Sequence, residues 1–185
     1  MSAMHSPWTC ACCGNEFDEL PLDVAVGRGP APYEDLTDEA RARASLTSDF
    51  CVIESAGQTD RFIRAAVEVP VPELGALFRW GVWVSLSEAS FARARELFPL
   101  AEMPPDEPAR FGWLSSRVFG YTPSTLNLET MLTFREGNQR PSVAIEPSDH
   151  PFSFEQREGI SVRRVQEIVA PLLHRSSPPA PMGGS

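Results

Sequence analysis

Three of the four cysteines in this 185-residue chain stand within four positions, as Cys10, Cys12 and Cys13. Cys10 and Cys13 form a C-x-x-C pair followed by Gly14, and two thiolates at that spacing can bind one tetrahedral zinc ion. Gly14 permits the tight backbone turn that such a pair needs. Two thiolates are only half of a zinc site, so the remaining ligands must come from elsewhere in the chain.

The candidate ligands outside this pair are few. We expect Cys51 to be the third ligand and either Cys12 or His150 to be the fourth. The alternative interpretation is that the cysteines are small buried side chains without a metal, because free cysteine is among the most buried residue types. The zinc hypothesis therefore requires Cys51 to lie beside Cys10 and Cys13.

The charge of the chain narrows the class of partner. Sixteen basic residues stand against twenty-five acidic ones, which gives a net charge of −9. Because such a chain repels a phosphate backbone, we expect no nucleic-acid partner. An unknown protein partner with a basic surface fits the acidity better. All sixteen basic residues are arginines, which excludes P-loop and Schiff-base lysines.

The sequence has no feature of a secreted or membrane protein. Residues 1–7 contain neither a basic nor an apolar segment of the kind that a secretory signal needs. No apolar stretch approaches the roughly eighteen residues of a membrane-spanning helix. We therefore expect a cytoplasmic protein without a membrane partner, in which clustered cysteines bind metal rather than form disulfides.

One domain is expected over residues 8–174. A hydrophobic content of 42% at this length supplies a sizeable core, and no linker divides the chain. Residues 1–7 are predicted to be a disordered leader. Residues 175–185, which are small and rich in proline and glycine, are predicted to be a disordered tail.

The hydrophobic pattern predicts an α+β fold. Five segments have the alternation or the β-branched content of strands, namely 50–54, 61–69, 80–86, 130–134 and 143–145. A helix follows the capping-box spacing of Ser85 and Glu88 and ends at Pro99, a weaker one covers 37–45, and the last begins after Ser161. Its apolar stripe consists of Val165, Ile168, Val169 and Leu172. Without regular strand–helix alternation, this predicts a single α+β domain with a mainly antiparallel sheet of about five strands, two or three helices and an N-terminal cysteine knuckle.

A second concentration of polar residues lies in the loop 146–151. Asp149 and His150 are adjacent there, and such a pair can act as acid–base machinery, with Cys51 as the nucleophile. The same segment is rich in turn formers, and Pro151 keeps His150 extended. We favour the turn, and we expect the His150 ring to bond a backbone carbonyl or a carboxylate rather than to face an open cleft.

Two tryptophans are candidates for an interaction surface. Strand alternation places Trp83 on the face opposite Trp80, and that face is either covered by the segment containing Trp113 or meets a partner. Covering is the more common fate, since most tryptophans supply core area.

Several segments together resemble a bacterial family known as domain of unknown function 2199. They are Cys10-x-x-Cys13-Gly14, Leu20-Pro21, 48–53, 61–64, 80–88, 111–114, 125–128, 146–151 and 155–160. The resemblance runs from Trp8 to His174 and implies a bacterial cytoplasmic protein without supplying an activity. Relatives often carry histidine where Phe17 stands, so a ligand at that position would be missing here.

From these observations we predict a non-enzymatic domain that binds a protein partner, of inhibitor or immunity type, with a structural Zn²⁺ at its cysteine knuckle. The alternative is a small enzyme with a polar site around Asp149 and His150, joined by Cys51. An enzyme would gather those residues in a concave pocket, whereas an interaction protein would have a flatter acidic or aromatic patch.

Overall fold

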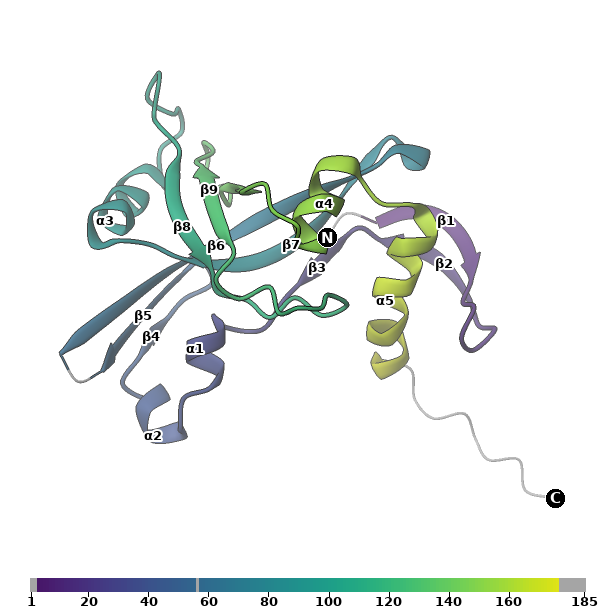
Figure 1. Ribbon diagram of the computed structural model, residues 1–185, viewed down its shortest axis with the longest axis horizontal. Coiled ribbons are helices and arrows are strands. Elements are labelled where there is room, and N and C mark those ends of the chain that lie inside the picture. Colours follow the sequence, from purple (N-terminus) through teal and green to yellow (C-terminus); the bar gives the residue numbers. More distant parts are fainter. Residues whose placement is uncertain (1–2, 56, 177–185) are drawn as a thin grey trace.

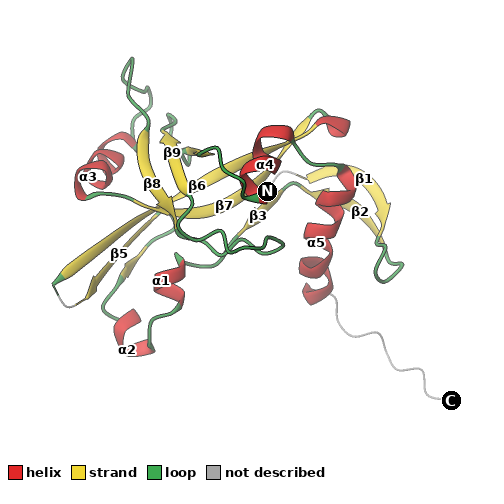
Figure 2. Ribbon diagram, viewed as in Figure 1, coloured by secondary structure: helices red, strands yellow, loops and turns green. Residues whose placement is uncertain are grey.

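The computed structural model of the chain describes residues 3–55 and 57–176. Over these residues the fold is α+β, as the sequence predicts, with ten strands in two sheets and five α-helices (Figures 1 and 2). None of these helices is long and apolar enough to cross a membrane.

A small closed barrel forms the centre of the larger sheet. The hairpin of β6 (Gln58–Val71) and β7 (Ala76–Ser85) is extended from β7 by β8 (Arg110–Leu114), β9 (Glu129–Thr133) and β10 (Ser142–Ile145), each antiparallel to its predecessor. β10 then pairs in parallel with β6, which closes a ring of five strands. Closure leaves these strands without a free edge along the ring.

Three further strands extend the barrel sheet. β3 (Asp23–Ala25) pairs in parallel with β7, while β5 (Phe50–Ser55) pairs with β6 and β4 (Ser45–Leu46) pairs with β5. All five strands predicted from the sequence lie in this sheet, as β5, β6, β7, β9 and β10. β3, β4 and β8 were not predicted; β3 and β4 are only three and two residues long.

The inward side chains of the barrel follow strand alternation. Every second residue of β6 and β7 is fully buried, namely Ile63, Ala65, Val67, Val69, Val71, Phe78, Trp80, Val82 and Val84. The Trp80 ring meets Phe78 and Phe119 edge to face, with centroid distances of 5.2 and 5.1 Å. Burial of this apolar surface is the main stabilising contribution to the barrel.

Helices cap the sheet at several places. α1 (Ala31–Glu34) and α2 (Asp38–Arg41) precede β4, and α2 is shorter than the predicted 37–45, since it ends at Arg41 and Ser45 belongs to β4. α3 (Glu88–Leu97) begins after Ser87, whose hydroxyl accepts a hydrogen bond from Ser90 N, so the cap is Ser87 rather than Ser85. α4 (Pro151–Glu158) was not predicted. Its first residue is Pro151, a position where the fixed φ of proline favours a helix start.

The second sheet is a hairpin of β1 (Ala3–Thr9) and β2 (Glu16–Pro21), and α5 (Val162–Ser176) lies against β2 (Figure 1). The predicted stripe of α5 is buried in the main core at Val165, Ile168 and Val169, and Pro171 lies inside the helix without ending it.

Of the expected leader, residues 3–7 are part of β1, whereas residues 1 and 2 lie outside the described residues. Of the expected tail, residues 175 and 176 close α5, and 177–185 lie outside the described residues.

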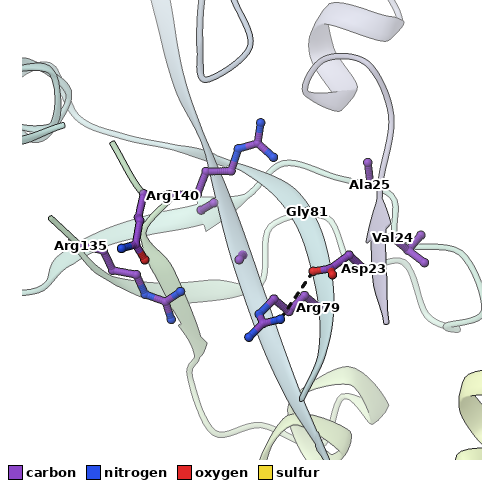
Figure 3. Close-up of a pocket in the computed structure, with 10 residues that line it drawn as sticks. Asp23, Val24, Ala25, Arg79, Gly81, Arg135 and Arg140 are labelled. Carbon is purple, nitrogen blue, oxygen red and sulfur yellow. Dashed lines mark ion pairs between the residues drawn. The ribbon is translucent and has the colours of Figure 1, made fainter. Parts of the chain in front are cut away.

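The outer face of the sheet carries a hollow of about 490 Å³ beside β3, β6 and β7 (Figure 3). The residues of β3 and β7 form one side of it, and Arg135 and Arg140 of the β9–β10 connection form another.

Candidate metal centre

The turn between β1 and β2 gathers the three clustered cysteines. Cys10 N donates to Asn15 O, and Gly14 N donates back to Cys10 O, both at 2.8 Å. Gly14 has φ +73°, a left-handed conformation that residues with a side chain rarely adopt. The loop therefore folds back on itself, and its three sulfur atoms lie close to one another.

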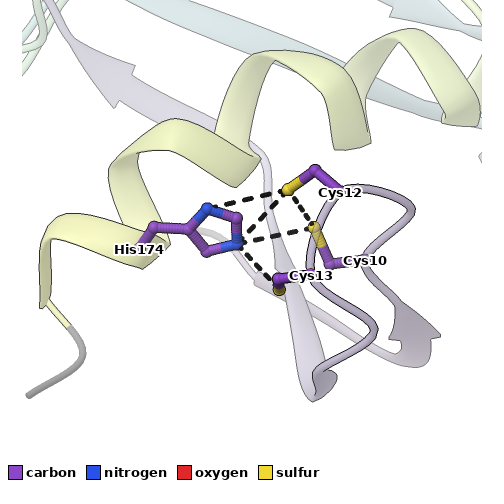
Figure 4. A group of neighbouring side chains, drawn as sticks. All are labelled: Cys10, Cys12, Cys13 and His174. Atoms are coloured by element: carbon purple, nitrogen blue, oxygen red, sulfur yellow. Dashed lines mark hydrogen bonds between the residues drawn. The ribbon is translucent and has the colours of Figure 1, made fainter. Parts of the chain in front are cut away.

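α5 supplies a fourth side chain from the other end of the sequence. Gln166, Ala170 and His174 follow one another at intervals of four residues, which places them on one face of the helix. Gln166 and Ala170 line a cavity of about 260 Å³ that Cys10 and Cys12 line from the hairpin side. His174 lies beyond this cavity and meets the sulfurs directly (Figure 4).

The nitrogen His174 Nε2 is close to all three sulfur atoms. Its distances to the Sγ atoms of Cys10, Cys12 and Cys13 are 3.5, 3.6 and 3.1 Å, and the sulfurs of Cys10 and Cys12 are 3.0 Å apart (Figure 4). One ligand atom from each of the four residues lies within 4.8 Å of every other. These four residues are close enough to hold a metal ion.

The distances between these ligand atoms can be compared with those around a tetrahedral zinc ion. A tetrahedral ion with Zn–S of about 2.3 Å and Zn–N of about 2.0 Å separates two sulfurs by about 3.8 Å and a sulfur from a nitrogen by about 3.5 Å. The three sulfur–nitrogen distances are near that value, whereas the sulfurs of Cys10 and Cys12 are closer together. A zinc ion would therefore require those two sulfurs to separate by about 0.8 Å.

The thiols of Cys10 and Cys12 also differ in acidity. A hydrogen bond from the Cys12 thiol lowers the pKa of Cys10 to about 6, and the same bond raises the pKa of Cys12 to about 11. Because the thiolate is the form that binds a metal, Cys10 is ready to bind at neutral pH. Cys12 would release its proton as the metal binds.

Cys51, expected as the third ligand, does not join this group. Its side chain is fully buried on β5 in a second apolar cluster with Tyr33, Ile53, Phe62 and Trp83. Burial raises the pKa of the Cys51 thiol to about 12, which keeps it protonated. The side chains that lie beside Cys10 and Cys13 are instead Cys12, one of the two expected alternatives for the fourth ligand, and His174.

His150, the other alternative for the fourth ligand, is engaged elsewhere. Its Nδ1 accepts a hydrogen bond from Phe152 N at 3.1 Å and so caps α4, while Nε2 is 3.0 Å from Pro123 O. The ring is 8% exposed, and the neighbouring Asp149 is exposed to solvent. The geometry is that of a residue that fastens the loop, and Cys51 belongs to a different cluster of side chains.

The two tryptophans have different environments. Trp83 is fully buried in the second cluster, where the Arg64 guanidinium lies over its ring at 5.5 Å, so it presents no surface to a partner. Trp113 on β8 is 42% exposed. Phe17 stacks on Trp8 at a centroid distance of 5.1 Å.

The sequence analysis did not identify His174 as a ligand. One pattern in the sequence does point to His174. Gln166 and His174 are eight residues apart and so lie on one face of the helix, which differs from the face of the apolar stripe of Val165, Ile168 and Val169. The interval shows which side chains share a face, but it does not show which loop that face meets.

Comparison with known families finds a match to a family model described as an uncharacterized protein conserved in bacteria, domain of unknown function 2199, over residues 9–160. The matched range includes the three clustered cysteines and ends before α5, so His174 lies outside it. The match confirms the resemblance seen in the sequence. No curated protein and no solved structure matches the chain.

Proposed function

The chain belongs to the bacterial family DUF2199, whose description names no activity, and from the geometry we propose that Cys10, Cys12, Cys13 and His174 bind one structural Zn²⁺. The observation that carries this proposal is the convergence of three sulfurs and one imidazole nitrogen from the two ends of the described chain. Three cysteines and one histidine are a ligand set typical of structural zinc.

The type of ligand set supports a structural rather than a catalytic metal. Catalytic zinc keeps one position for water or substrate, whereas four protein ligands fill a tetrahedral ion. The centre joins the β1–β2 hairpin to the last turn of α5. In this role the metal adds to the apolar contacts of α5 at the end of a junction that contains a cavity of about 260 Å³.

Metal analysis of the purified full chain tests the proposal. We expect one zinc per chain in the wild type, and its loss in Cys10→Ser and in His174→Ala. Cys51→Ser is the matched control, because it removes a thiol of the same type from a buried position outside the centre, and it should retain the zinc. Replacement by Co²⁺ should give the visible absorption of a tetrahedral thiolate site. Zinc content unaffected by His174→Ala, or lost in a folded Cys51→Ser, would contradict the proposal.

We also propose that the outer face of β8 binds a basic protein partner. The supporting observation is the pair Phe111 and Trp113, which are 44% and 42% exposed and meet edge to face at 5.1 Å. The register places Met131 of β9 opposite Phe111 and Glu129 opposite Trp113. Exposed aromatic pairs of this kind are enriched at protein interfaces.

The charge of the chain supports a basic partner. The protein carries a net charge of −9, and exposed Glu129 lies directly beside Trp113. An apolar centre with an acidic neighbour is complementary to a partner surface with a hydrophobic pocket and basic residues around it.

Site-specific photocrosslinking in living cells tests this second proposal. A photoreactive phenylalanine at position 113 should give adducts with a basic protein that high salt prevents and that Phe111→Ser abolishes. Phe154 on α4, which is 57% exposed, is the matched control position and should give no such adduct. Identical adducts from both positions, or an adduct only with a second copy of the chain, would overturn it.

A further inference from the structure

The hollow on the outer face has a floor of small residues. Ala66 of β6, Gly81 of β7 and Ala25 of β3 are register partners across three neighbouring strands, so their positions face the same side of the sheet. A side chain on Gly81 would meet Ala25 at 3.5 Å, an ordinary contact, so close packing does not require glycine there. The small residues instead leave space above the strands.

Arginines surround this floor (Figure 3). Arg79 is two residues before Gly81 on β7, and Arg135 and Arg140 reach the hollow from the β9–β10 connection. Asp23 is the one acidic residue among those that line it. Three arginines therefore line a cavity whose volume of about 490 Å³ is in the range of small-molecule sites.

Carboxylates at the margin hold these guanidiniums in place and leave part of each one available. Glu68 accepts from Arg79 Nε at 3.1 Å and from Arg135 Nη2 at 2.5 Å, and Asp49 accepts from Arg140 Nε at 2.9 Å. Arg135 and Arg140 each use only one guanidinium nitrogen in these hydrogen bonds. The remaining N–H groups are oriented donors of the kind that bind a carboxylate or phosphate in two-point fashion.

The local charges do not cancel. Arg64 lies two residues before Ala66 on β6, on the same face, and its Nε is buried without a hydrogen-bond partner. Burial lowers the pKa of the Arg64 guanidinium. The nearby charge of Arg140 lowers it further, whereas the charge of Asp49 acts in the opposite direction. Together, Arg64, Arg79, Arg135 and Arg140 face three carboxylates, those of Asp23, Asp49 and Glu68. One positive charge is left over in a chain whose net charge is −9.

We propose that this hollow is a binding site for a small oxyanion, a carboxylate or phosphate group of a small molecule, held by Arg79, Arg135 and Arg140 above the floor of Ala25, Ala66 and Gly81. The charge of Arg64, which lies beside the hollow on β6, also favours a negatively charged ligand. The small floor residues admit the body of the molecule, and Gln139 at the rim adds an amide that can donate or accept. The site is separate from the Cys/His centre and does not depend on it.

Titration of the full chain with inorganic phosphate and, separately, with citrate tests the proposal and distinguishes the two chemistries. Binding is followed by calorimetry at low salt and by NMR shifts of backbone amides. We expect saturable binding of at least one probe, with the shifts concentrated in residues 23–25, 65–66 and 79–81. Arg140→Gln should weaken that binding by about tenfold or more, because a charge-assisted contact is lost.

Two further variants distinguish specific binding in the hollow from nonspecific attraction of an anion to surface arginines. Ala66→Leu fills the floor without changing any charge, and it should also weaken binding. Arg43→Gln is the matched control, since it removes an exposed arginine that is paired with Glu39 on α2, and it should leave binding unchanged. Circular dichroism establishes that each variant is folded, and Gly81→Ala replaces Ala66→Leu if the latter does not fold. Absence of binding by both probes, shifts outside the hollow, or equal weakening by Arg43→Gln would overturn the proposal.

Discussion

In the barrel, β6 and β7 are joined by ten residue pairs, and their inward side chains from Ile63 to Val84 are fully buried. At the junction of the hairpin with α5, a cavity of about 260 Å³ separates the helix from the cysteine loop, and the side chains that meet beyond it are three thiols and an imidazole. Apolar burial stabilises the barrel and also holds the stripe of α5 in the main core, whereas at its far end the junction is joined by the polar side chains of Cys10, Cys12, Cys13 and His174. The two regions should therefore respond differently to the same perturbation.

The largest effect is expected from a substitution in the barrel. Trp80→Ala removes a fully buried ring that contacts Phe78 and Phe119, and the loss should lower the free energy of unfolding by about 3–5 kcal/mol. Urea denaturation followed by far-UV circular dichroism measures this change. Trp113→Ala, at a 42% exposed position, is the control and should cost much less. If the two variants lost similar amounts of unfolding free energy, apolar burial in the barrel would not be the main source of stability.

Removal of zinc by a chelator should act on the other region. If free zinc stands at a hundredfold its dissociation constant, the metal adds about 2.7 kcal/mol to the stability of the native state. We expect chelation to increase amide hydrogen exchange in β1, β2 and α5, while β6 and β7 keep their protection. Mass spectrometry of exchanged peptides measures both regions in one experiment. A uniform increase over the whole chain would show that the two regions are not independent.

His150→Ala should have a smaller effect, confined to the start of α4. The substitution removes the acceptor for Phe152 N and the contact with Pro123 O, and loss of a helix cap typically costs about 1 kcal/mol. Thermal unfolding of His150→Ala and of His150→Asn should separate the two contributions, because asparagine is itself a good cap. Zinc content should be unchanged in both variants. Loss of zinc would mean that this histidine is linked to the metal centre after all.

An effect that is confined to acid is expected at a polar contact between α3 and β8. Arg93 and Arg110 hydrogen-bond Glu107 and lower the pKa of its carboxyl from 4.5 to about 2. Because the folded pKa is the lower one, this contact stabilises the protein above about pH 4.5, and the contribution is lost as the pH falls toward 2. Glu107→Gln should flatten the dependence of the melting temperature on pH within this window. Glu167→Gln on α5, an exposed pair with Arg163, should not.

The sequence predicted the strands of the larger sheet better than the junction for a physical reason, although it did not predict that five of them close into a barrel. Strand alternation from Ile63 to Val69 and the apolar stripe of α5 are local patterns, and they place β6 and the helix correctly. The hairpin of β1 and β2 was not predicted, because the mixed polarity of residues 16–19 gives no clear alternation. α4 was not predicted, because proline is typical of turns as well as of the first position of a helix, and the residues before Pro151 favour a turn.

The candidate site was predicted only in part. Cys10 and Cys13 are neighbours in sequence, so their spacing indicates metal binding directly. Cys51 was placed correctly on a strand, but alternation alone does not show which cluster its buried face joins. His174 is 161 residues from Cys13, and the contact between them depends on how α5 lies against the hairpin. A single sequence contains no local signal for such a contact.

The separation between Cys13 and His174 also orders events in time. As the polypeptide leaves the ribosome, the three cysteines emerge first and the imidazole follows only after the whole barrel has been translated. The proposed coordination sphere can then close only around a chain that already contains every barrel strand. A nascent or prematurely terminated chain would expose three cysteines without their fourth ligand, which makes it a better target for oxidation and quality control than the finished protein.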